Sequence, residues 1–263
     1  MTEDGTHFTA AIARTPAGSF AQGLTTAGLG APDLERALRQ HAAYCDALER
    51  LGVRVTVLPP DPAHPDSTFV EDTAVVTARG AMLSRPGAPS RAGEVVAMRE
   101  ALQPRVAALA SIREPGTLDG GDICQAGVTF FIGLSHRTNE EGARQLAAWL
   151  EDAGYAATTI DIRGSATLLH LKSGIAWLGG REMVVAEALA AHPALQAYRL
   201  IVVPADETYA ANCVRVNDAV LMAAGFPALA ERVAALGHRV VTLEMSEFRK
   251  MDGGLSCLSL RLP

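Results

Sequence analysis

A unit of two short β-rich runs, a helix and a further strand recurs along the chain, and it constrains the fold more than any other feature. The hairpin runs begin near Asp72, Asp122, Gly174 and Asn212. A supersecondary unit repeated every ~40–50 residues is typical of propellers and other repeat folds. An ordinary mixed α/β sheet stays open as the alternative. The predicted helices that follow the hairpins are residues 91–110, 139–153, 187–197 and 227–236.

The N-terminal part supplies further elements of the same kinds. Residues 8–13 suggest a buried strand, and Asp33 can cap a helix over residues 34–51 that ends before Gly52. A period-two strand follows at residues 53–57. Thr138 and Glu141 have the spacing of a capping box for the helix at 139–153. The remaining predicted strands are residues 155–162, 200–203, 239–243 and 258–262. No linker divides the chain, so a single domain over residues 1–263 is expected.

Composition excludes several classes of protein. The 263 residues include 23 Lys and Arg against 29 Asp and Glu, for a net charge of −6, which argues against a nucleic-acid binder. The longest apolar runs fall short of the ~20 residues that span a bilayer. Residues 1–5 are polar and acidic, unlike a signal peptide. We therefore expect a cytoplasmic protein with a small-molecule partner and no nucleic-acid or membrane partner.

The four cysteines lack a CxxC motif and differ in their surroundings. Cys45, Cys124 and Cys213 lie in apolar helix or strand patterns and suggest small buried hydrophobes. Cys257 follows Gly253-Gly254 and leads into the last strand. A glycine-rich bend lets the backbone approach a ligand closely, so Cys257 is a candidate nucleophile. A purely structural cysteine stays open at this point.

Two acidic clusters and one histidine are the other candidates for chemistry. Residues 66–72 and 118–122 hold the clusters, at the starts of repeat units, and His170 interrupts an apolar run. Gathered carboxylates repel one another unless a cation neutralises them, and that cation can be a metal or a guanidinium group. Aspartates that only cap turns, and a histidine that only packs in the core, are the alternatives.

Eight stretches, spread over nearly the whole chain, carry a family resemblance. They are ARTPAGSFAQGLT, HPDSTFVEDTAVV, SRPGAPSR, GTLDGGDI, FFIGLSHRTNEEGARQ, LLHLKSG, YAANCVRVN and MDGGLSCLSLRL. In this order they resemble the dimethylarginine dimethylaminohydrolase family of the guanidino-modifying, or pentein, superfamily. The resemblance implies a five-bladed α/β propeller of pseudo-fivefold ββαβ units. It also implies hydrolysis of Nω-methylated arginine to citrulline and methylamine or dimethylamine, with no cofactor and no metal.

The resemblance also assigns roles to individual residues. Cys257 would be the nucleophile, which forms a thiouronium intermediate, and His170 the general acid and base. Asp119, where some members carry Glu, would support His170, and Asp72 would bind the guanidinium with Glu71 beside it. The remaining implied substrate contacts are Asp66 for the α-amino group, Arg91 and Arg137 for the carboxylate, and the carbonyls of Leu24 and Met251.

The glycine-rich segment of residues 18–30 is expected to act as a lid. Glycines at 18, 23, 28 and 30 leave it easy to bend, and Leu24 is an apolar residue in a segment otherwise suited to solvent. The alternative is a passive surface loop.

Four other functions compete with this prediction. As that family is known, arginine deiminases carry a carboxylate two residues after the histidine, where this chain has Lys172. An amino-acid-binding protein without activity would not need Cys257, and a cysteine protease would not need the acidic clusters. Amidinotransferases would need a second amine site, which no motif indicates. A homodimer is left open.

Overall fold

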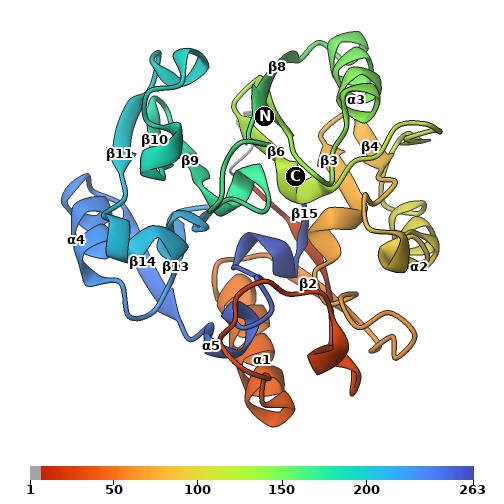
Figure 1. The fold of residues 1–263 in the computed structure, drawn as a ribbon, viewed down its shortest axis with the longest axis horizontal. Helices are drawn as coiled ribbons and strands as arrows, with labels where there is room; N and C mark the ends of the chain where they lie inside the picture. Colours follow the sequence, from red (N-terminus) through yellow and green to blue (C-terminus); the bar gives the residue numbers. More distant parts are fainter. Residues whose placement is uncertain (1–6) are drawn as a thin grey trace.

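The computed structural model describes residues 7–263 and contains five three-stranded sheets arranged around a central axis (Figure 1). In four sheets a hairpin supplies two antiparallel strands, and a third strand adds in parallel after a crossover. These sheets are β3 (Ala74–Thr77), β4 (Gly80–Leu83) and β5 (Leu109–Ser111); β6 (Ile123–Ala126), β7 (Thr129–Leu134) and β8 (Ala156–Asp161); β9 (Ile175–Gly179), β10 (Glu182–Val185) and β11 (Arg199–Val202); and β12 (Val214–Val216), β13 (Ala219–Ala223) and β14 (Arg239–Leu243). The predicted propeller of repeated ββαβ units is confirmed.

The fifth sheet joins the two ends of the chain. Strand β15 (Leu260–Leu262) pairs antiparallel with β1 (Ala10–Arg14), which pairs in parallel with β2 (Arg54–Leu58). This pairing gives the fifth sheet the same strand pattern as the others, although its hairpin partner comes from the far end of the sequence. The polar segment of residues 1–5 lies outside the described residues.

The helices lie on the outside of the ring (Figure 1). They are α1 (Leu34–Arg50), α2 (Glu94–Leu102), α3 (Glu140–Asp152), α4 (Pro227–Ala235) and the short α5 (Ser246–Arg249). The core lies largely between neighbouring sheets: Val75 of β3 packs in one cluster with Phe130 of β7, and Phe131 of β7 in another with Met183 of β10. No helix within residues 7–263 has the length and apolar character to cross a membrane.

Two predicted helices differ from the structure, and proline explains both. The helix predicted over 91–110 ends at Leu102, before Pro104, and the chain then forms β5. The helix predicted over 187–197 is instead two 3₁₀ turns, η6 (Glu187–Leu189) and η7 (Pro193–Leu195). A proline inside a helix removes a backbone hydrogen bond and clashes with the preceding turn.

The N-terminus of α3 also differs from the predicted capping box. Asn139 is the cap, and its Oδ1 accepts a hydrogen bond of 2.8 Å from the Gly142 amide. The Thr138 hydroxyl turns inward and donates to Asp122 at 2.6 Å. Thr138 therefore serves the centre of the ring rather than the helix.

A short 3₁₀ turn precedes the innermost strand of every sheet. These turns are η2 (Val70–Thr73), η4 (Gly120–Asp122), η5 (Leu171–Ser173), η8 (Ala205–Ala211) and η9 (Ser256–Leu258). Contacts link η9 to η2, η2 to η4, η4 to η5, and η5 to η8, so the turns follow one another around the axis. Residues at equivalent positions in distant repeats are thereby brought together.

Candidate active site

The central turns surround a small pocket that contains most of the predicted site residues. Its cavity of about 30 Å³ has room for about two water molecules. The lining residues are Leu24, Asp66, Phe69, Asp72, Arg91, Arg137, Leu169, His170, Met251, Asp252, Gly253 and Cys257. Of the predicted site residues, all but Asp119 and Glu71 line it.

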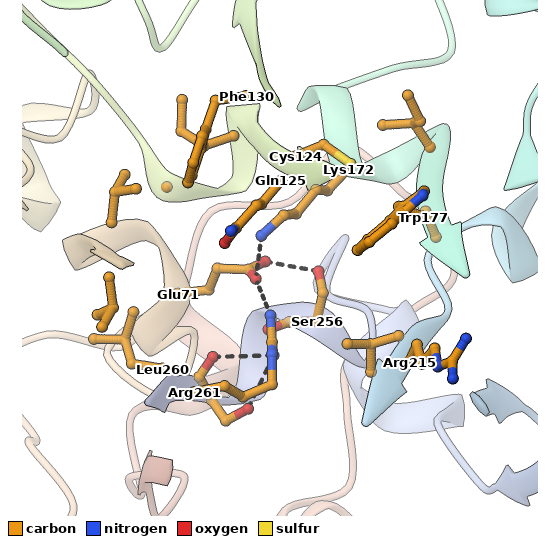
Figure 2. Close-up of a pocket in the computed structure, with 18 of the residues that line it drawn as sticks. Glu71, Cys124, Gln125, Phe130, Lys172, Trp177, Arg215, Ser256, Leu260 and Arg261 are labelled. Carbon is orange, nitrogen blue, oxygen red and sulfur yellow. Dashed lines mark hydrogen bonds and ion pairs between the residues drawn. The ribbon is translucent and has the colours of Figure 1, made fainter. Parts of the chain in front are cut away.

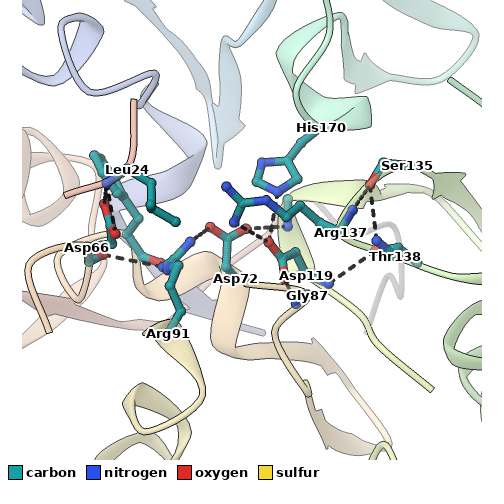
Figure 3. A network of polar contacts seen from close by, with 12 residues as sticks. Leu24, Asp66, Asp72, Gly87, Arg91, Asp119, Ser135, Arg137, Thr138 and His170 are labelled. Carbon is teal, nitrogen blue, oxygen red and sulfur yellow. Dashed lines mark hydrogen bonds and ion pairs between the residues drawn. The ribbon is translucent and has the colours of Figure 1, made fainter. Parts of the chain in front are cut away.

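Asp119 lies behind His170 and is fully buried. Its Oδ2 is 3.0 Å from His170 Nε2, and its Oδ1 accepts from the Gly87 amide at 2.9 Å (Figure 3). The aspartate is therefore long enough to reach the imidazole at this position. Burial, the largest single effect, favours the neutral carboxyl, but the hydrogen bond and charge of His170, the charge of Arg91 and the Gly87 amide together hold the pKa of Asp119 below its usual range.

His170 is surrounded by negative charge. Burial alone would lower the pKa of His170, but the carboxylates of Asp72, Asp119 and Asp122 raise it to about 9. The imidazole is therefore protonated at neutral pH and carries a proton that it can give to a leaving group.

Asp122 is a residue of the site to which sequence reasoning gave no role. It is fully buried and accepts hydrogen bonds from the Leu171 amide at 3.0 Å and from the hydroxyls of Ser135 and Thr138 at 2.6 Å each. The Ser135 hydroxyl in turn accepts from the Arg137 amide at 2.9 Å. Asp122 thus holds the backbone next to His170 and next to Arg137.

Asp72 lies between Arg91 on one side and the Asp119–His170 pair on the other (Figure 3). Its Oδ2 accepts from Arg91, and its Oδ1 accepts from the Gly121 amide at 2.9 Å. Arg91 is buried and is also paired with Glu94 at 2.8 Å. Its guanidinium is therefore held by protein carboxylates at the edge of the pocket.

The loop that carries Leu24 covers the side of the pocket where Asp66 lies. The Leu24 amide donates to both Asp66 oxygens at 3.1 Å. Gly23 is needed for this approach, because a Cβ there would lie 2.3 Å from Asp66 Oδ1. Leu24 itself is 43% exposed, so it is not part of the core. Arg137, also on the pocket wall, lies 3.6 Å from Asp119.

Cys257 is partly buried in η9, and its sulfur receives backbone and side-chain donors. The Gly254 amide lies 3.4 Å from Sγ, and Asn212 Nδ2 lies 4.0 Å away. Burial, followed by the nearby carboxylates of Glu71 and Asp72, raises the pKa of the Cys257 thiol to about 12. The pocket wall therefore carries both a neutral thiol and an imidazolium.

Asn212 is the second site residue that the sequence analysis did not assign. It follows directly after η8 and lies within hydrogen-bonding distance of Ser256 and of the Cys257 sulfur. The repeat pattern already placed a hairpin start at Asn212, and this was the available signal. A Cβ on Gly254 would lie 2.4 Å from Asn212 Cγ, so glycine is required for this contact.

Glu71 does not enter the pocket beside Asp72, as the resemblance implied. Its carboxylate points to the opposite side of the ring and bonds Lys172 Nζ at 2.6 Å, Ser256 Oγ at 2.6 Å and Arg261 at 2.8 Å. Successive side chains of a 3₁₀ turn diverge by roughly 120°, so Glu71 and Asp72 face different cavities. Lys172 is likewise absent from the pocket wall.

Asp72, Asp119 and His170 place possible metal-ligand atoms within 4.8 Å of one another. All three also take part in hydrogen bonds within the protein. What the pocket offers chemically is a thiol, a proton donor and carboxylates around a space suited to a planar cation.

Comparisons with known proteins agree with this geometry. Residues 57–219 match the family model described as arginine deiminase. The N(G),N(G)-dimethylarginine dimethylaminohydrolase of Pseudomonas aeruginosa is 46% identical over 251 residues, which are 95% of this chain and 98% of that protein. A crystal structure of the Pseudomonas protein, a cysteine-to-serine mutant complexed with citrulline, superposes with a TM-score of 0.95 at 45% identity and covers 97% of this chain and all of that one.

A second structure from these comparisons is a dimethylarginine dimethylaminohydrolase in which glycine replaces a histidine, as an adduct with S-methyl-L-thiocitrulline. It has a TM-score of 0.94 and 45% identity, and covers 97% of this chain and all of that one.

Five small sheets around a central pocket with a cysteine, a histidine and carboxylates define a pentein of the guanidino-modifying class. Within that class, the chain belongs to the dimethylarginine dimethylaminohydrolase family.

Proposed function

We propose that this protein hydrolyses Nω-methylated arginines to citrulline and dimethylamine or methylamine. The observation that carries the proposal is the central pocket, in which the partly buried Cys257 thiol lies with the protonated His170 and the buried Asp72 carboxylate. Near-full-length similarity to a dimethylarginine dimethylaminohydrolase, and to its complex with citrulline, supports the same reaction.

In the proposed first half-reaction, the cationic substrate favours ionisation of Cys257, since a nearby positive charge lowers the pKa of a thiol, and the thiol proton leaves to water. The thiolate attacks the central guanidinium carbon. His170 gives its proton to the methylated nitrogen, the C–N bond breaks, and the neutral amine leaves. A thiouronium cation on Cys257 and a neutral imidazole remain.

In the second half-reaction, His170 takes a proton from water as the water oxygen adds to the same carbon. The C–S bond then breaks, its electron pair returns to Cys257, and transfer of a proton from the product to this thiolate gives citrulline and the starting thiol. Asp119 keeps the imidazole oriented through both steps, because it bonds Nε2 at 3.0 Å.

The other contacts follow from their positions on the pocket wall. We propose that Asp72 binds the guanidinium, that Asp66 and the Leu24 carbonyl bind the α-amino group, and that Arg137 with Arg91 binds the substrate carboxylate. Met251 supplies a further backbone contact.

We also propose that residues 18–30 form a lid on a single catalytic domain of residues 1–263. A cavity of about 30 Å³ cannot take an amino acid the size of arginine, so the covering loop has to move for binding. In the present state Thr25 and Thr26 bond Lys250 and Asp252 across the loop at 2.7 Å and 2.5 Å. Exclusion of water by the closed loop would strengthen carboxylate–guanidinium contacts.

Arginine deiminase activity is the second candidate, because the matching family model carries that description. Arginine deiminases carry a carboxylate at the position of Lys172. Without that carboxylate more room is left around the guanidinium, and this favours the methylated substrate. We propose that the enzyme is cytoplasmic. Light scattering distinguishes a monomer from a homodimer in solution.

The test measures citrulline release from asymmetric dimethylarginine, monomethylarginine and arginine. We expect release from the methylated substrates and little from arginine. Preference for arginine would favour a deiminase, and binding without release from any of the three would favour an inactive amino-acid-binding protein.

A further inference from the structure

The cavity on the opposite side of the ring from the candidate active site contains a buried charge cluster that the proposed mechanism does not use. This cavity measures about 120 Å³ (Figure 2). Glu71 is 2% exposed and lies at the centre of the cluster, with Lys172, Ser256 and Arg261 around its carboxylate. One carboxylate against two cations leaves the cluster with a net charge of +1.

Three pairs of residues close in sequence have one side chain on each of the two sides of the ring. In each pair one side chain lines the active-site pocket, and a residue one or two positions away in the sequence joins the charge cluster behind it. The pairs are Asp72 with Glu71, Cys257 with Ser256, and His170 with Lys172. The Glu71 carboxylate therefore ties together the backbones that carry three pocket residues.

Asn212 closes the same network. Its Oδ1 accepts from the Ser256 amide at 3.0 Å, while its Nδ2 donates to Ser256 Oγ at 3.2 Å and to the Lys172 carbonyl at 3.1 Å. The turn that contains Cys257 and the turn after His170 are thus connected both through Asn212 and through Glu71. A shift of one turn would change the distance between the sulfur and the imidazole.

We infer that Glu71 is a positioning residue: from behind the pocket it sets the distance between Cys257 and His170 and the electrostatic potential at the Cys257 sulfur. It does so without touching the substrate. The inference rests on the proposed function only where turnover is measured, because thiol reactivity can be followed without it.

The cluster acts on Cys257 through two opposing charges. Glu71 raises the pKa of the Cys257 thiol and Lys172 lowers it, in addition to the larger effect of burial. Removing one charge should therefore change the reactivity of Cys257 in a direction that depends on which charge is removed. The other charged or titratable groups around Cys257 are Asp66, Asp72, Arg91, Arg137, His170, Tyr209 and Asp252.

The experiment measures alkylation of Cys257 by iodoacetamide, a neutral reagent, against pH, with the label located by mass spectrometry. At a fixed pH below the thiol pKa we expect Glu71→Gln to react about tenfold faster and Lys172→Met about tenfold slower than the parent protein. The double variant returns the cluster to +1 and should react within about threefold of the parent. Glu182→Gln removes a carboxylate at the start of β10, where it pairs with Arg199 outside the charge cluster, and this matched control should change nothing.

Turnover is the second readout. Glu71→Gln should lower kcat by about 10- to 100-fold, because small misplacements of reacting groups have effects of this size, while KM changes less than about threefold. The double variant should recover part of the lost kcat. If the parent protein releases no citrulline, the proposed function fails, and the alkylation profiles still test the inference.

Three outcomes would overturn the inference. An increased KM with unchanged kcat and alkylation in Glu71→Gln would make Glu71 a direct substrate ligand. Faster alkylation in both single variants would indicate only a loosened structure, and unchanged alkylation in both would remove the electrostatic role. If Glu71→Gln does not fold, Lys172→Met and the double variant decide by the same criteria.

Discussion

Burial and neighbouring charges set the charge states of Cys257 and His170. The thiol pKa is raised to about 12 and the imidazole pKa to about 9, so at neutral pH the sulfur is protonated and the ring is charged. A cation that enters between the sulfur and the carboxylates offsets their negative charge and so lowers the pKa of the Cys257 thiol. The resting site therefore suits a cationic substrate and gives little reactivity without one.

Cys257→Ser is expected to abolish citrulline formation and leave the fold unchanged, because a hydroxyl is a far poorer nucleophile than a thiolate at this position. Activity assays and circular dichroism measure the two effects. Among the cysteines, a haloacetamidine should label Cys257 fastest, since Cys45, Cys124 and Cys213 are buried. Labelling mainly at one of those three would refute the assignment.

His170→Gly should stop the reaction after the thiol has attacked. Thiolate formation depends on the substrate cation, whereas both proton transfers use the imidazole, and help of this kind is worth ~10²–10⁴ in rate. A substrate with a good leaving group should accumulate as a Cys257 adduct visible by mass spectrometry. Citrulline formation at the parent rate would contradict this role.

The raised pKa of His170 also predicts how stability varies with pH. A folded-state pKa of about 9 against 6.5 means that the protonated ring stabilises the fold fully below pH 6.5. This contribution, on the order of 3 kcal/mol, is lost as the pH rises towards and through 9. Urea unfolding at pH 6 and pH 9.5 should show a larger loss for the parent protein than for His170→Gly. Equal losses would show that His170 is not the responsible group.

At the scale of elements, the five 3₁₀ turns bring the site together and the loop over residues 18–30 covers it. The turns are short and packed against one another, whereas the loop is attached through side-chain bonds to residues 250 and 252 and to Asp66. Phe20 anchors the start of the loop in the core against Phe69 and Phe248, whereas residues 24–30 are exposed or only partly buried. Such exposure is typical of segments that open at low cost in free energy.

Leu24→Gly tests the loop. The variant should lower kcat/KM about tenfold, because a more flexible loop closes less often over the substrate. The free energy of unfolding should change by less than about 0.5 kcal/mol, because Leu24 is exposed. Leu29→Gly is the control, since Leu29 lies on the same loop but is absent from the pocket wall. Equal effects of the two changes on kcat/KM would contradict a specific role for Leu24.

At the scale of the whole molecule, stability depends on closure of the ring by the two chain ends. Leu260 of β15 is 4% exposed and packs with Ile12 of β1 and Leu83 of β4, across two sheets. Cys257 lies three residues before Leu260, so closure of the ring and placement of the nucleophile are connected.

Leu260→Ala should therefore reduce the free energy of unfolding by about 2–5 kcal/mol and also lower activity. Leu38→Ala, at an exposed position of α1, should have an effect within about 0.5 kcal/mol. Denaturant unfolding and citrulline assays measure both quantities. A small change in stability for Leu260→Ala would mean that the ring does not depend on this closure.

Most of the secondary structure could be predicted, because hydrophobic period, glycine and caps act over a few residues. The strand at Arg239–Leu243 matches its prediction, and the helices end before glycines 52, 154 and 237, which adopt positive φ. The prediction of a helix over 187–197 was wrong, because Pro193 interrupts the helical pattern and begins a separate 3₁₀ turn. The capping box was wrong because Asp122, distant in sequence, competes for the Thr138 hydroxyl.

The sequence by itself determined the repeat, the class of fold and the residue types that can act on a guanidinium, since all three are visible in local patterns. Only the tertiary structure decided which side of the ring each side chain faces and which charge it carries. Glu71 and Asp72 are neighbours in sequence, but the turn sends them to different cavities. The ionisation of Cys257 and His170 depends on burial and on charges brought from other sheets, and no local pattern contains those distances.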